Sequence, residues 1–378
     1  MKKLGIYVHI PFCERKCNYC DFYSLVKSDE VEDRYISALL EEIKSYKNIS
    51  EEYVVDTIFL GGGTPSYLKP DNIGLILNEI NNNFLVSNDA EITMEANPNS
   101  ITKENVIKYR QYGINRMSVG IQSLDNMVLK SIGRLHNSDE ALNALDTIKD
   151  AGIDNINADV MFNIPGQTIE SIVDTLNKIM LKDVKHISFY SLKLEEGTPM
   201  YKMEEKGLID MVDDEVERSM YYAGRELMES KGFLQYEISN FAKEGYECRH
   251  NIKYWTGGEY IGFGPFAHSC FKDNRYNNLS DIRLYCDNMN NPDNYRQLNE
   301  VLTKDSKIFE YIMLRLRMNK GINLEDFKNQ FNEDFIIKYS NQLKKLKDYE
   351  LIIVDDSSIR LSKKGMDVSN YVFEEFLA

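Results

Sequence analysis

The chain has 378 residues, of which 43% are hydrophobic, and a formal net charge of −15 at pH 7. A chain of this length can bury a large core, and we expect one large domain followed by a small one. The negative charge argues against nucleic acid and against an anionic membrane surface as partners, because both require a basic face. No apolar run approaches the roughly 20 residues of a transmembrane helix. The first residues read as a strand rather than a signal peptide, so we expect a cytoplasmic protein with reduced cysteines.

Short apolar runs alternate with helix-length segments through the first half of the chain. The runs are apolar on both faces, which indicates buried parallel strands joined by right-handed crossovers. We expect strands at residues 5–10, 56–63, 91–97, 116–122, 156–164 and 186–192, with helices near 31–48 and 71–83. Six such units predict an α/β fold of the incomplete (β/α)6 barrel type rather than a closed eightfold barrel.

The remaining segments predict an extension of the barrel and a separate module. A long helix at 213–231, a β-like stretch at 236–242 and a glycine-rich segment at 256–266 complete a domain over residues 1–290. The polar NNPDNYRQ (290–297) reads as a link. Helices at 308–317, 324–331 and 334–347 then precede a hairpin at 350–362, with DDSS at its turn. This order is typical of a winged helix at 300–378, which we expect to act as a lid or packing unit rather than to bind DNA.

Three cysteines lie within eight positions on the loop after the first strand: Cys13, Cys17 and Cys20. The carboxyl end of a barrel strand is where α/β barrels place their sites. A structural zinc site wants four ligands, and no fourth Cys or His follows nearby. The pattern instead favours a [4Fe–4S] cluster with one iron free of protein ligands. That iron can chelate the amino and carboxylate groups of S-adenosylmethionine (SAM).

Polar residues at the ends of later strands fit the same site. The glycines of GGGTPS (61–66) allow close backbone approach, and a phosphate loop is disfavoured because no GK[ST] follows. Glu95, Gln122 and Asp159 lie at or near the ends of three different strands and can hydrogen-bond a ribose and an amino-acid moiety. Arg134 can form a bidentate pair with the SAM carboxylate. For each of these residues, the alternative to SAM binding is a structural role or a place on the surface.

The cysteine spacing, with Tyr19 just before the last cysteine, resembles the radical-SAM superfamily. YVHIPFC, GGGTPS, EANP, GIQS and PGQT, in this order, resemble its oxygen-independent coproporphyrinogen-III-oxidase family over essentially the whole chain. The resemblance implies that Cys13, Cys17 and Cys20 hold the cluster. It also implies SAM contacts by Tyr7, Tyr19, Gly62, Gly63, Thr64, Glu95, Gln122, Arg134 and Asp159.

Two departures separate this chain from the oxidases of that family. The oxidases resemble CxxxCxxCxC, whereas Phe22 stands at the position of the fourth cysteine. The first strand also begins near residue 4, without the N-terminal arm that is expected to help cover the oxidase substrate. Both departures argue against decarboxylation of coproporphyrinogen.

HNIKYW (250–255) matches the HNxxYW signature of the heme-chaperone (HemW-type) branch. The match implies heme contact by His250, Tyr254 and Trp255, since a neutral imidazole ligates heme iron and aromatic rings pack on a porphyrin. In the alternative, His250 and Asn251 fix a loop and Trp255 is core. Cys248 is an alternative to His250 as the axial ligand of the heme iron. His268 is expected to stabilise a loop beside the SAM site.

The leading hypothesis is a heme chaperone that takes heme from a donor and delivers it to an acceptor hemoprotein, expected to be respiratory. The cluster and SAM would gate transfer or perform limited radical chemistry, and no residue is assigned a catalytic role. The alternatives are oxidative decarboxylation of a porphyrinogen and radical-driven heme degradation. Homodimer formation and peripheral association with the inner face of the membrane are further expectations.

Overall fold

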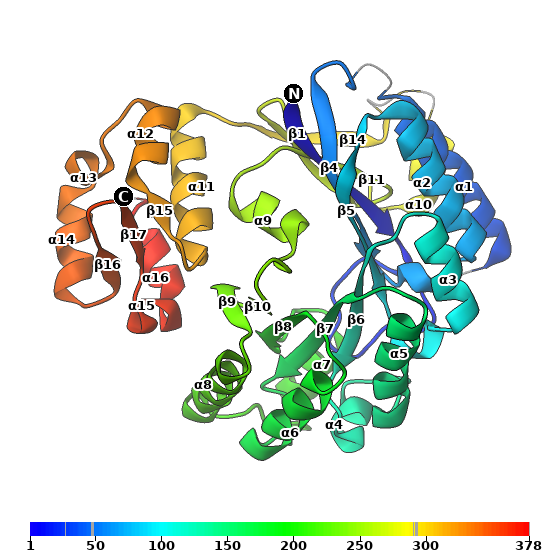
Figure 1. The fold of residues 1–378 in the computed structure, drawn as a ribbon, viewed down its shortest axis with the longest axis horizontal. Coiled ribbons are helices and arrows are strands. Elements are labelled where there is room, and N and C mark those ends of the chain that lie inside the picture. Colours follow the sequence, from blue (N-terminus) through cyan, green and yellow to red (C-terminus); the bar gives the residue numbers. More distant parts are fainter. Residues whose placement is uncertain (27, 47–48, 290, 292–293, 378) are drawn as a thin grey trace.

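A large mixed sheet is built around the first strand of the chain (Figure 1). The structure, a computed structural model, describes residues 1–26, 28–46, 49–289, 291 and 294–377. Within these residues the sheet has twelve strands in the order β14-β13-β12-β11-β1-β4-β5-β6-β7-β8-β10-β9. Its centre consists of parallel strands: Lys2–Ile10 (β1), Tyr53–Gly62 (β4), Val86–Ala96 (β5), Arg116–Gln122 (β6), Asn155–Phe162 (β7) and His186–Ser191 (β8). The expected partial α/β barrel is confirmed.

Helices connect these strands and cover one side of the sheet (Figure 1). All seven residues of β6 are buried, as expected for a strand covered on both faces. The connecting helices are Asp29–Lys44 (α1), Pro70–Asn83 (α2), Lys103–Gln111 (α3), Asn126–Ser131 (α4), Ser138–Asp150 (α5) and Ile169–Met180 (α6). A capping box of Asn137 and Glu140 begins α5. The helix expected near 31–48 ends at Lys44, and residues 47–48 lie outside the described residues.

Both edges of the parallel sheet are extended by other strands. Tyr260–Phe263 (β11) runs parallel to β1, and three antiparallel strands follow it: His268–Phe271 (β12), Asn274–Asn278 (β13) and Arg296–Val301 (β14). We refer to β11–β14 as the sheet extension. At the other edge, Asn240–Ala242 (β10) is antiparallel to β8, and Leu234–Glu237 (β9) is antiparallel to β10. Four helices lie between these strands: Pro199–Glu205 (α7), Asp214–Ser230 (α8), Arg249–Trp255 (α9) and Ile282–Asp287 (α10).

The strands β12–β14 were not predicted from the sequence. The segment NRYNN of β13 shows no alternation of apolar and polar residues, and its partner strand ends 23 positions further along at Val301. β14 begins inside the segment predicted as a polar link, of which residues 290 and 292–293 lie outside the described residues. The division into domains 1–290 and 300–378 therefore stays a prediction, since β14 of the large sheet spans its boundary.

The C-terminal residues form a module with its own hydrophobic core. Its helices are Lys304–Arg317 (α11), Leu324–Phe331 (α12), Phe335–Lys338 (α13), Ser340–Asp348 (α14), Lys363–Asp367 (α15) and Ser369–Glu374 (α16). Its strands Ile322–Asn323 (β15), Ile352–Val354 (β16) and Ser358–Leu361 (β17) pair in the order β15-β17-β16. The hairpin lies where it was expected. The helix expected at 334–347 is instead two helices that meet at Tyr339, and α15 and α16 were not predicted.

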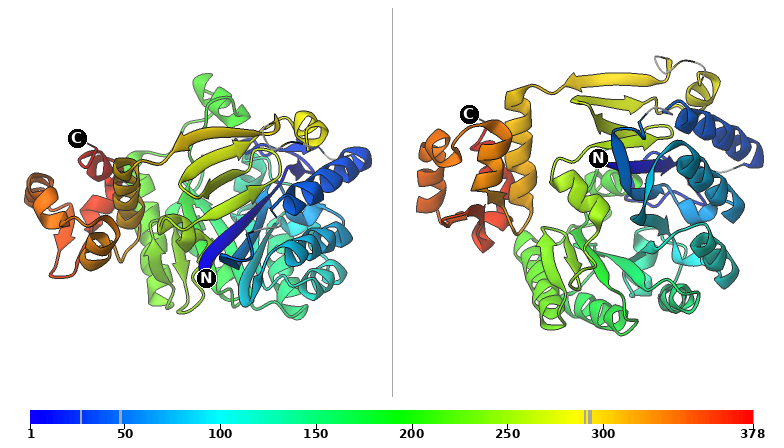
Figure 2. Two further views of the ribbon diagram at one scale, coloured as in Figure 1. Left: turned by 90° about the horizontal axis from the view of Figure 1, so that it is seen from above. Right: turned by 45° about the horizontal axis from the view of Figure 1, so that its top comes forward.

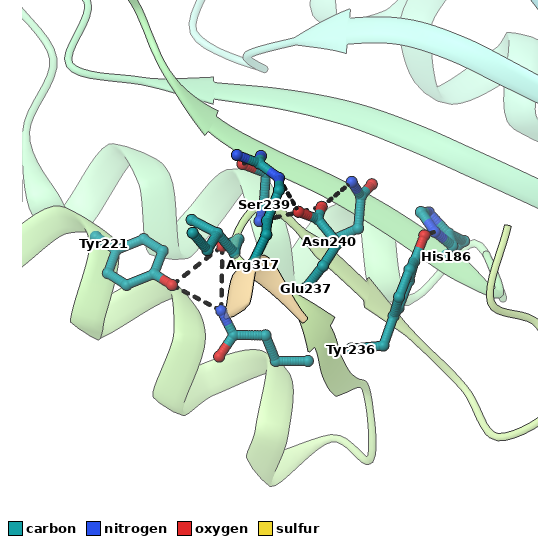
Figure 3. A network of polar contacts seen from close by, with 9 residues as sticks. His186, Tyr221, Tyr236, Glu237, Ser239, Asn240 and Arg317 are labelled. Atoms are coloured by element: carbon teal, nitrogen blue, oxygen red, sulfur yellow. Dashed lines mark hydrogen bonds and ion pairs between the residues drawn. The ribbon is translucent and has the colours of Figure 1, made fainter. Parts of the chain in front are cut away.

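The module is held to the barrel through α9 and α11. Helix α9 lies between the sheet and the module in the views of Figures 1 and 2. Figure 3 shows Arg317 of α11 reaching Glu237 (Nε–Oε2 2.8 Å) and Ser239 (Nη2–Oγ 3.3 Å) beyond β9. The Arg317 guanidinium also lies 4.4 Å from the centre of the Trp255 ring. The Arg317 side chain thus joins the C-terminal module to the edge of the barrel and to α9.

Among the described residues, helices that combine the length and the apolar character needed to span a membrane are absent.

Candidate functional site

The carboxyl ends of the central strands enclose a cavity of about 440 Å³, which we name the first cavity. Its walls come from the loops after β1 and β4 and from the ends of β5, β6, β7 and β8. The parallel register pairs Ile10 with Gly62, so the cysteine loop and the glycine loop begin side by side. Two short parallel strands, Phe12–Cys13 (β2) and Leu25–Val26 (β3), close the cysteine loop on itself.

The three cysteines of this loop all line the first cavity, and each is half-buried. Thr64 Oγ1 lies 3.5 Å from Cys13 Sγ, and Arg134 Nη1 lies 3.7 Å from Cys17 Sγ. Burial raises the pKa of Cys20 to about 11. Because metals bind the thiolate, cluster assembly at this loop must release protons.

The arrangement of the thiols suits a cluster. Within the described part of the chain, no three His, Cys, Asp or Glu side chains converge to hold a single metal ion. The cysteines instead lie together on the wall of a cavity that is also lined by the carboxyl groups of Glu95 and Asp159 and by the guanidinium of Arg134. Three thiolates on one wall can each bind a different iron and leave the fourth iron facing the cavity. The residues present therefore fit a [4Fe–4S] cluster with SAM beside it.

The glycine loop is packed closely against the cysteine loop. Its backbone amides donate to partners within the protein: Gly62 to Glu95 Oε2 (3.1 Å), Gly63 to Ile10 O (2.8 Å) and Thr64 to Phe12 O (2.7 Å). Gly62 has a φ of +105°, and a Cβ added at Gly63 would lie 2.6 Å from Phe12 O. Because these amides are already used, the phosphate-loop alternative lacks its donors here.

Glu95 and Asp159 are among the carboxyl groups that line the first cavity. Burial, together with the nearby Asp159, raises the pKa of Glu95 to about 8. Burial also raises the pKa of Asp159, although Asn157 Nδ2 donates to its Oδ1 at 2.7 Å. Carboxyl oxygens at these positions can accept hydrogen bonds from ribose hydroxyls or neutralise an ammonium or sulfonium group.

Gln122 and Arg134 complete the wall opposite the glycine loop. Gln122 ends β6 with a φ of 66°, a left-handed conformation that is uncommon outside glycine and often found at functional sites. Its Oε1 accepts a hydrogen bond from the Tyr190 hydroxyl at 2.8 Å. Arg134 Nη2 donates to Asn97 Oδ1 at 2.8 Å and to Gly120 O at 2.5 Å. These bonds hold the guanidinium at the edge of the cavity.

The structure brings together all of the predicted SAM contacts except Tyr7. The residues that line the first cavity are Tyr19, Gly62, Gly63, Thr64, Glu95, Gln122, Arg134 and Asp159. Tyr7 lies instead at a second cavity, where its hydroxyl pairs with His9 Nδ1 at 3.1 Å. The contact between Tyr7 and SAM stays a prediction that its position does not support.

Several other residues of the cavity lining were not predicted, among them Asn97, Ser118, Ser188 and Tyr190. Asn97 stands in the EANP motif, and its Nδ2 donates to Thr64 Oγ1 at 3.0 Å. Ser188 and Tyr190 alternate along β8, and this period of two could have placed them on the inner face of the barrel. Ser118 and Gly120 likewise lie two positions apart on β6, and both line the first cavity.

The second cavity has a volume of about 680 Å³ and lies between the sheet extension and the C-terminal module. Tyr254 and Trp255 of the HNIKYW motif line it, but His250 does not. His250 is 1% exposed, and its ring nitrogens pair with Thr57 Oγ1 (2.9 Å) and the Tyr254 hydroxyl (2.8 Å). Burial lowers the pKa of His250 to about 3. Iron ligation by His250 stays a prediction, and it would require one of these bonds to break.

Two other residues weighed for roles near heme or SAM are also placed by the structure. Cys248 is fully buried, with its Sγ 3.5 Å from Glu91 Oε1, and it lines neither cavity. His268, expected beside the SAM site, lines the second cavity instead of the first. The physical reason is the strand order: β12 pairs with β11, on the side of β1 away from β4–β8, whose carboxyl ends line the first cavity.

Comparison with known families agrees with this geometry. Residues 7–179 match the radical SAM superfamily, and residues 302–368 match the HemN C-terminal domain. The fold is similar to that of coproporphyrinogen III oxidase (HemN) from Escherichia coli, with a TM-score of 0.86 over 99% of this chain and 90% of that one. The two chains are 22% identical, so this likeness concerns the fold alone.

Curated relatives are similar over the whole length. The heme chaperone HemW of Lactococcus lactis subsp. lactis is 34% identical over 100% of this chain and 98% of its own length. The heme chaperone HemW of Bacillus subtilis is 34% identical over 98% of each chain. The chain therefore belongs to the radical SAM superfamily and, within it, to the family of the HemW heme chaperones.

Proposed function

We propose that this chain is a heme chaperone that holds a [4Fe–4S] cluster and SAM in the first cavity and carries heme as cargo in the second. The observation that carries the proposal is the full-length similarity to curated heme chaperones, which includes the barrel and the C-terminal module. A cavity of about 680 Å³ supports it, because cofactor sites typically measure roughly 300–1,000 Å³.

In this proposal Cys13, Cys17 and Cys20 bind the cluster, and the predicted polar residues of the first cavity bind SAM. When bound, the cluster and SAM supply one-electron chemistry. The residues of the chain orient SAM: Arg134 faces its carboxylate, while Glu95 and Asp159 accept from its hydroxyl or ammonium groups. None of these residues is assigned a catalytic role.

Phe22 connects the two sites. It lines both cavities, its side chain is 61% exposed, and it stands where the related oxidases have a further cysteine. An apolar ring at this position can contact a porphyrin edge but cannot ligate iron. This supports heme carriage over decarboxylation of a porphyrinogen.

The proposed partners are a heme donor and an acceptor hemoprotein, for which we propose a respiratory protein. A cytoplasmic location, peripheral association with the inner face of the membrane and a homodimer belong to the same proposal. The charge of −15 argues against nucleic acid as a partner of the C-terminal module.

The test compares heme retention with porphyrinogen turnover. Protein purified without oxygen and with its cluster reconstituted is mixed with heme, and separately with coproporphyrinogen III, SAM and a reductant. We expect heme to remain with the protein through gel filtration and no carbon dioxide to be released. Formation of vinyl groups with release of carbon dioxide would overturn the proposal.

The variant Cys17→Ser tests the assignment of the cluster ligands. It should remove the normal absorption spectrum of the cluster, because a [4Fe–4S] site with two thiolates lacks a ligand it needs. Heme retention should persist, since Cys17 lines the first cavity and not the second. Unchanged iron and sulfide content in this variant would contradict the assignment of the cluster ligands.

A further inference from the structure

The walls of the second cavity have the chemistry of a porphyrin site. Tyr254, Trp255, Tyr260, Phe266 and Tyr311 contribute aromatic rings from α9, the sheet extension and α11. Such rings pack on a flat conjugated macrocycle. Arg275 and Lys307 line the same cavity, each in an ion pair with a carboxylate that also lines it: Glu310 (2.8 Å) and Asp273 (2.7 Å) respectively. Carboxylate side chains of a ligand would compete with these two pairs for the cations.

Four of the five histidines in the chain are buried and already hold hydrogen bonds. They are His9 (4% exposed), His136 (3%), His186 (0%) and His250 (1%). In three of them both ring nitrogens are paired, and in His136 the Nε2 pairs with Ile121 O. A heme iron could reach these imidazoles only after internal bonds were broken and side chains moved.

His268 differs from the other four. It begins β12, its side chain is exposed, and it lines the second cavity. Its ring packs edge-on against Phe266 with 5.5 Å between centroids, and it has no hydrogen bond to any described residue. Burial and the neighbouring Arg275 lower the pKa of His268, which favours the neutral imidazole that ligates iron.

Cys270 is a second candidate iron ligand in this cavity, whereas His9, which also lines it, has both ring nitrogens hydrogen-bonded. Cys270 lies two positions after His268 on β12 and therefore on the same face of the strand. It is half-buried between its register partners Tyr260 and Arg275, whereas the side chain of His268 is exposed. The imidazole is therefore the more accessible of the two ligands.

We propose that heme in the second cavity is ligated at its iron by a ring nitrogen of His268, with His250 serving to hold Tyr254 in the cavity wall. This inference rests on the proposed function and assigns its iron ligand. The step is the donation of an imidazole lone pair to the iron, with displacement of water or another weak ligand. It needs no oxidant and no proton transfer.

The experiment uses the full chain with its cluster assembled and titrates it with ferric heme, following the Soret band and the electron paramagnetic resonance signal of the iron. His268→Ala should weaken heme binding by roughly tenfold or more, as loss of a metal ligand typically does, and shift the Soret band. Added imidazole should restore the wild-type spectrum. Asn277→Ala, the cross-strand neighbour of His268 outside the cavity lining, is the matched control.

His250→Gln and Cys270→Ser separate the competing ligands. Both should keep the wild-type position of the Soret band, which the iron ligand determines. His250→Gln should also lower the melting temperature and weaken heme binding, because Thr57 or Tyr254 loses a partner and Tyr254 is less firmly held in the cavity wall. An unchanged spectrum in His268→Ala, or loss of the wild-type spectrum in either other variant, would overturn the assignment of His268. Wild-type protein that retains no heme would overturn the proposed function itself, so the two failures are distinguishable.

Discussion

At the scale of single residues, Glu95 and Asp159 determine the charge of the first cavity. Each carboxyl group is half-buried, burial raises the pKa of both, and the charge of Asp159 also contributes to the raised pKa of Glu95. In the protein without ligand, Glu95 is therefore largely protonated at neutral pH. A cationic ligand such as SAM would favour its ionised form, so the cavity is suited to a positively charged guest.

This raised pKa predicts a pH-dependent stability difference between the wild type and Glu95→Gln. Below about pH 4.5 Glu95 is neutral in both the folded and unfolded states, as glutamine is. As pH rises, the unfolded chain ionises first and the folded protein loses stability, until Glu95 also ionises in the fold near pH 8. The quantity to follow is the free energy of unfolding of the wild type minus that of the variant. At high pH this difference should be about 2–4 kcal/mol lower than at low pH.

Urea unfolding of the cluster-free protein under reducing conditions, at intervals from pH 4.5 to 9, checks this expectation. The glutamine keeps an oxygen that can accept from the Gly62 amide, so the comparison isolates the charge. A stability difference that stays constant over this range would contradict the raised pKa of Glu95.

At the scale of secondary-structure elements, helix α1 anchors the sheet extension through Glu42. This carboxylate is buried and accepts three hydrogen bonds, which come from Gly264 N (2.9 Å), Asn278 Nδ2 (2.7 Å) and the Tyr285 hydroxyl (2.6 Å). Its partners come from the end of β11, from β13 and from α10. One side chain of α1 thus positions the strands that carry the wall of the second cavity.

Glu42→Gln should destabilise the fold by about 1–3 kcal/mol, because an amide turns one accepting oxygen into a donor and leaves a buried donor unpaired. Glu41→Gln is the matched control: Glu41 is exposed and pairs only with Lys44 on the same helix, and its loss should change stability by less than about 0.5 kcal/mol. Urea unfolding of the three proteins measures both effects. Equal stability of the two variants would show that Glu42 does not anchor the extension.

At the scale of the whole molecule, Arg317 joins the C-terminal module to the barrel. Glu237, its ion-pair partner, is 0% exposed, and its carboxylate also accepts from Ser239 N and Asn240 Nδ2 (Figure 3). The second cavity lies between the module and the sheet extension, so the position of the module determines whether that cavity exists. Docking of the module and formation of the cargo site are therefore linked.

Arg317→Ala should lower stability by about 3 kcal/mol, because removing one partner leaves the other charge buried. The Arg317 guanidinium lies over Trp255, the single tryptophan of the chain, so the emission maximum should also shift. Lys178→Ala, which breaks the exposed pair with Asp174, is the control and should leave both readouts unchanged. If Arg317→Ala had the same emission maximum as the wild type, the contact between Arg317 and Trp255 would not report docking of the C-terminal module onto the barrel.

The sequence alone was sufficient wherever a feature depends on local pattern. The alternation of apolar runs and helices predicted the parallel strands, and the spacing of Cys13, Cys17 and Cys20 predicted one loop at their carboxyl ends. The strand-end positions of Glu95, Gln122 and Asp159 placed them in one cavity, because parallel strands end at the same edge of a sheet.

Only the tertiary structure decided the second cavity and the environments of its histidines. His250 and His268 lie in neighbouring segments of the sequence, yet one is enclosed by Thr57 and Tyr254 and the other is exposed on a strand that pairs antiparallel. Tyr7 precedes the cysteine loop in sequence but lies at the other cavity. Burial and hydrogen-bond partners arise from contacts between residues far apart in the chain, such as His250 and Thr57 at a separation of 193 positions, and no local pattern encodes such contacts.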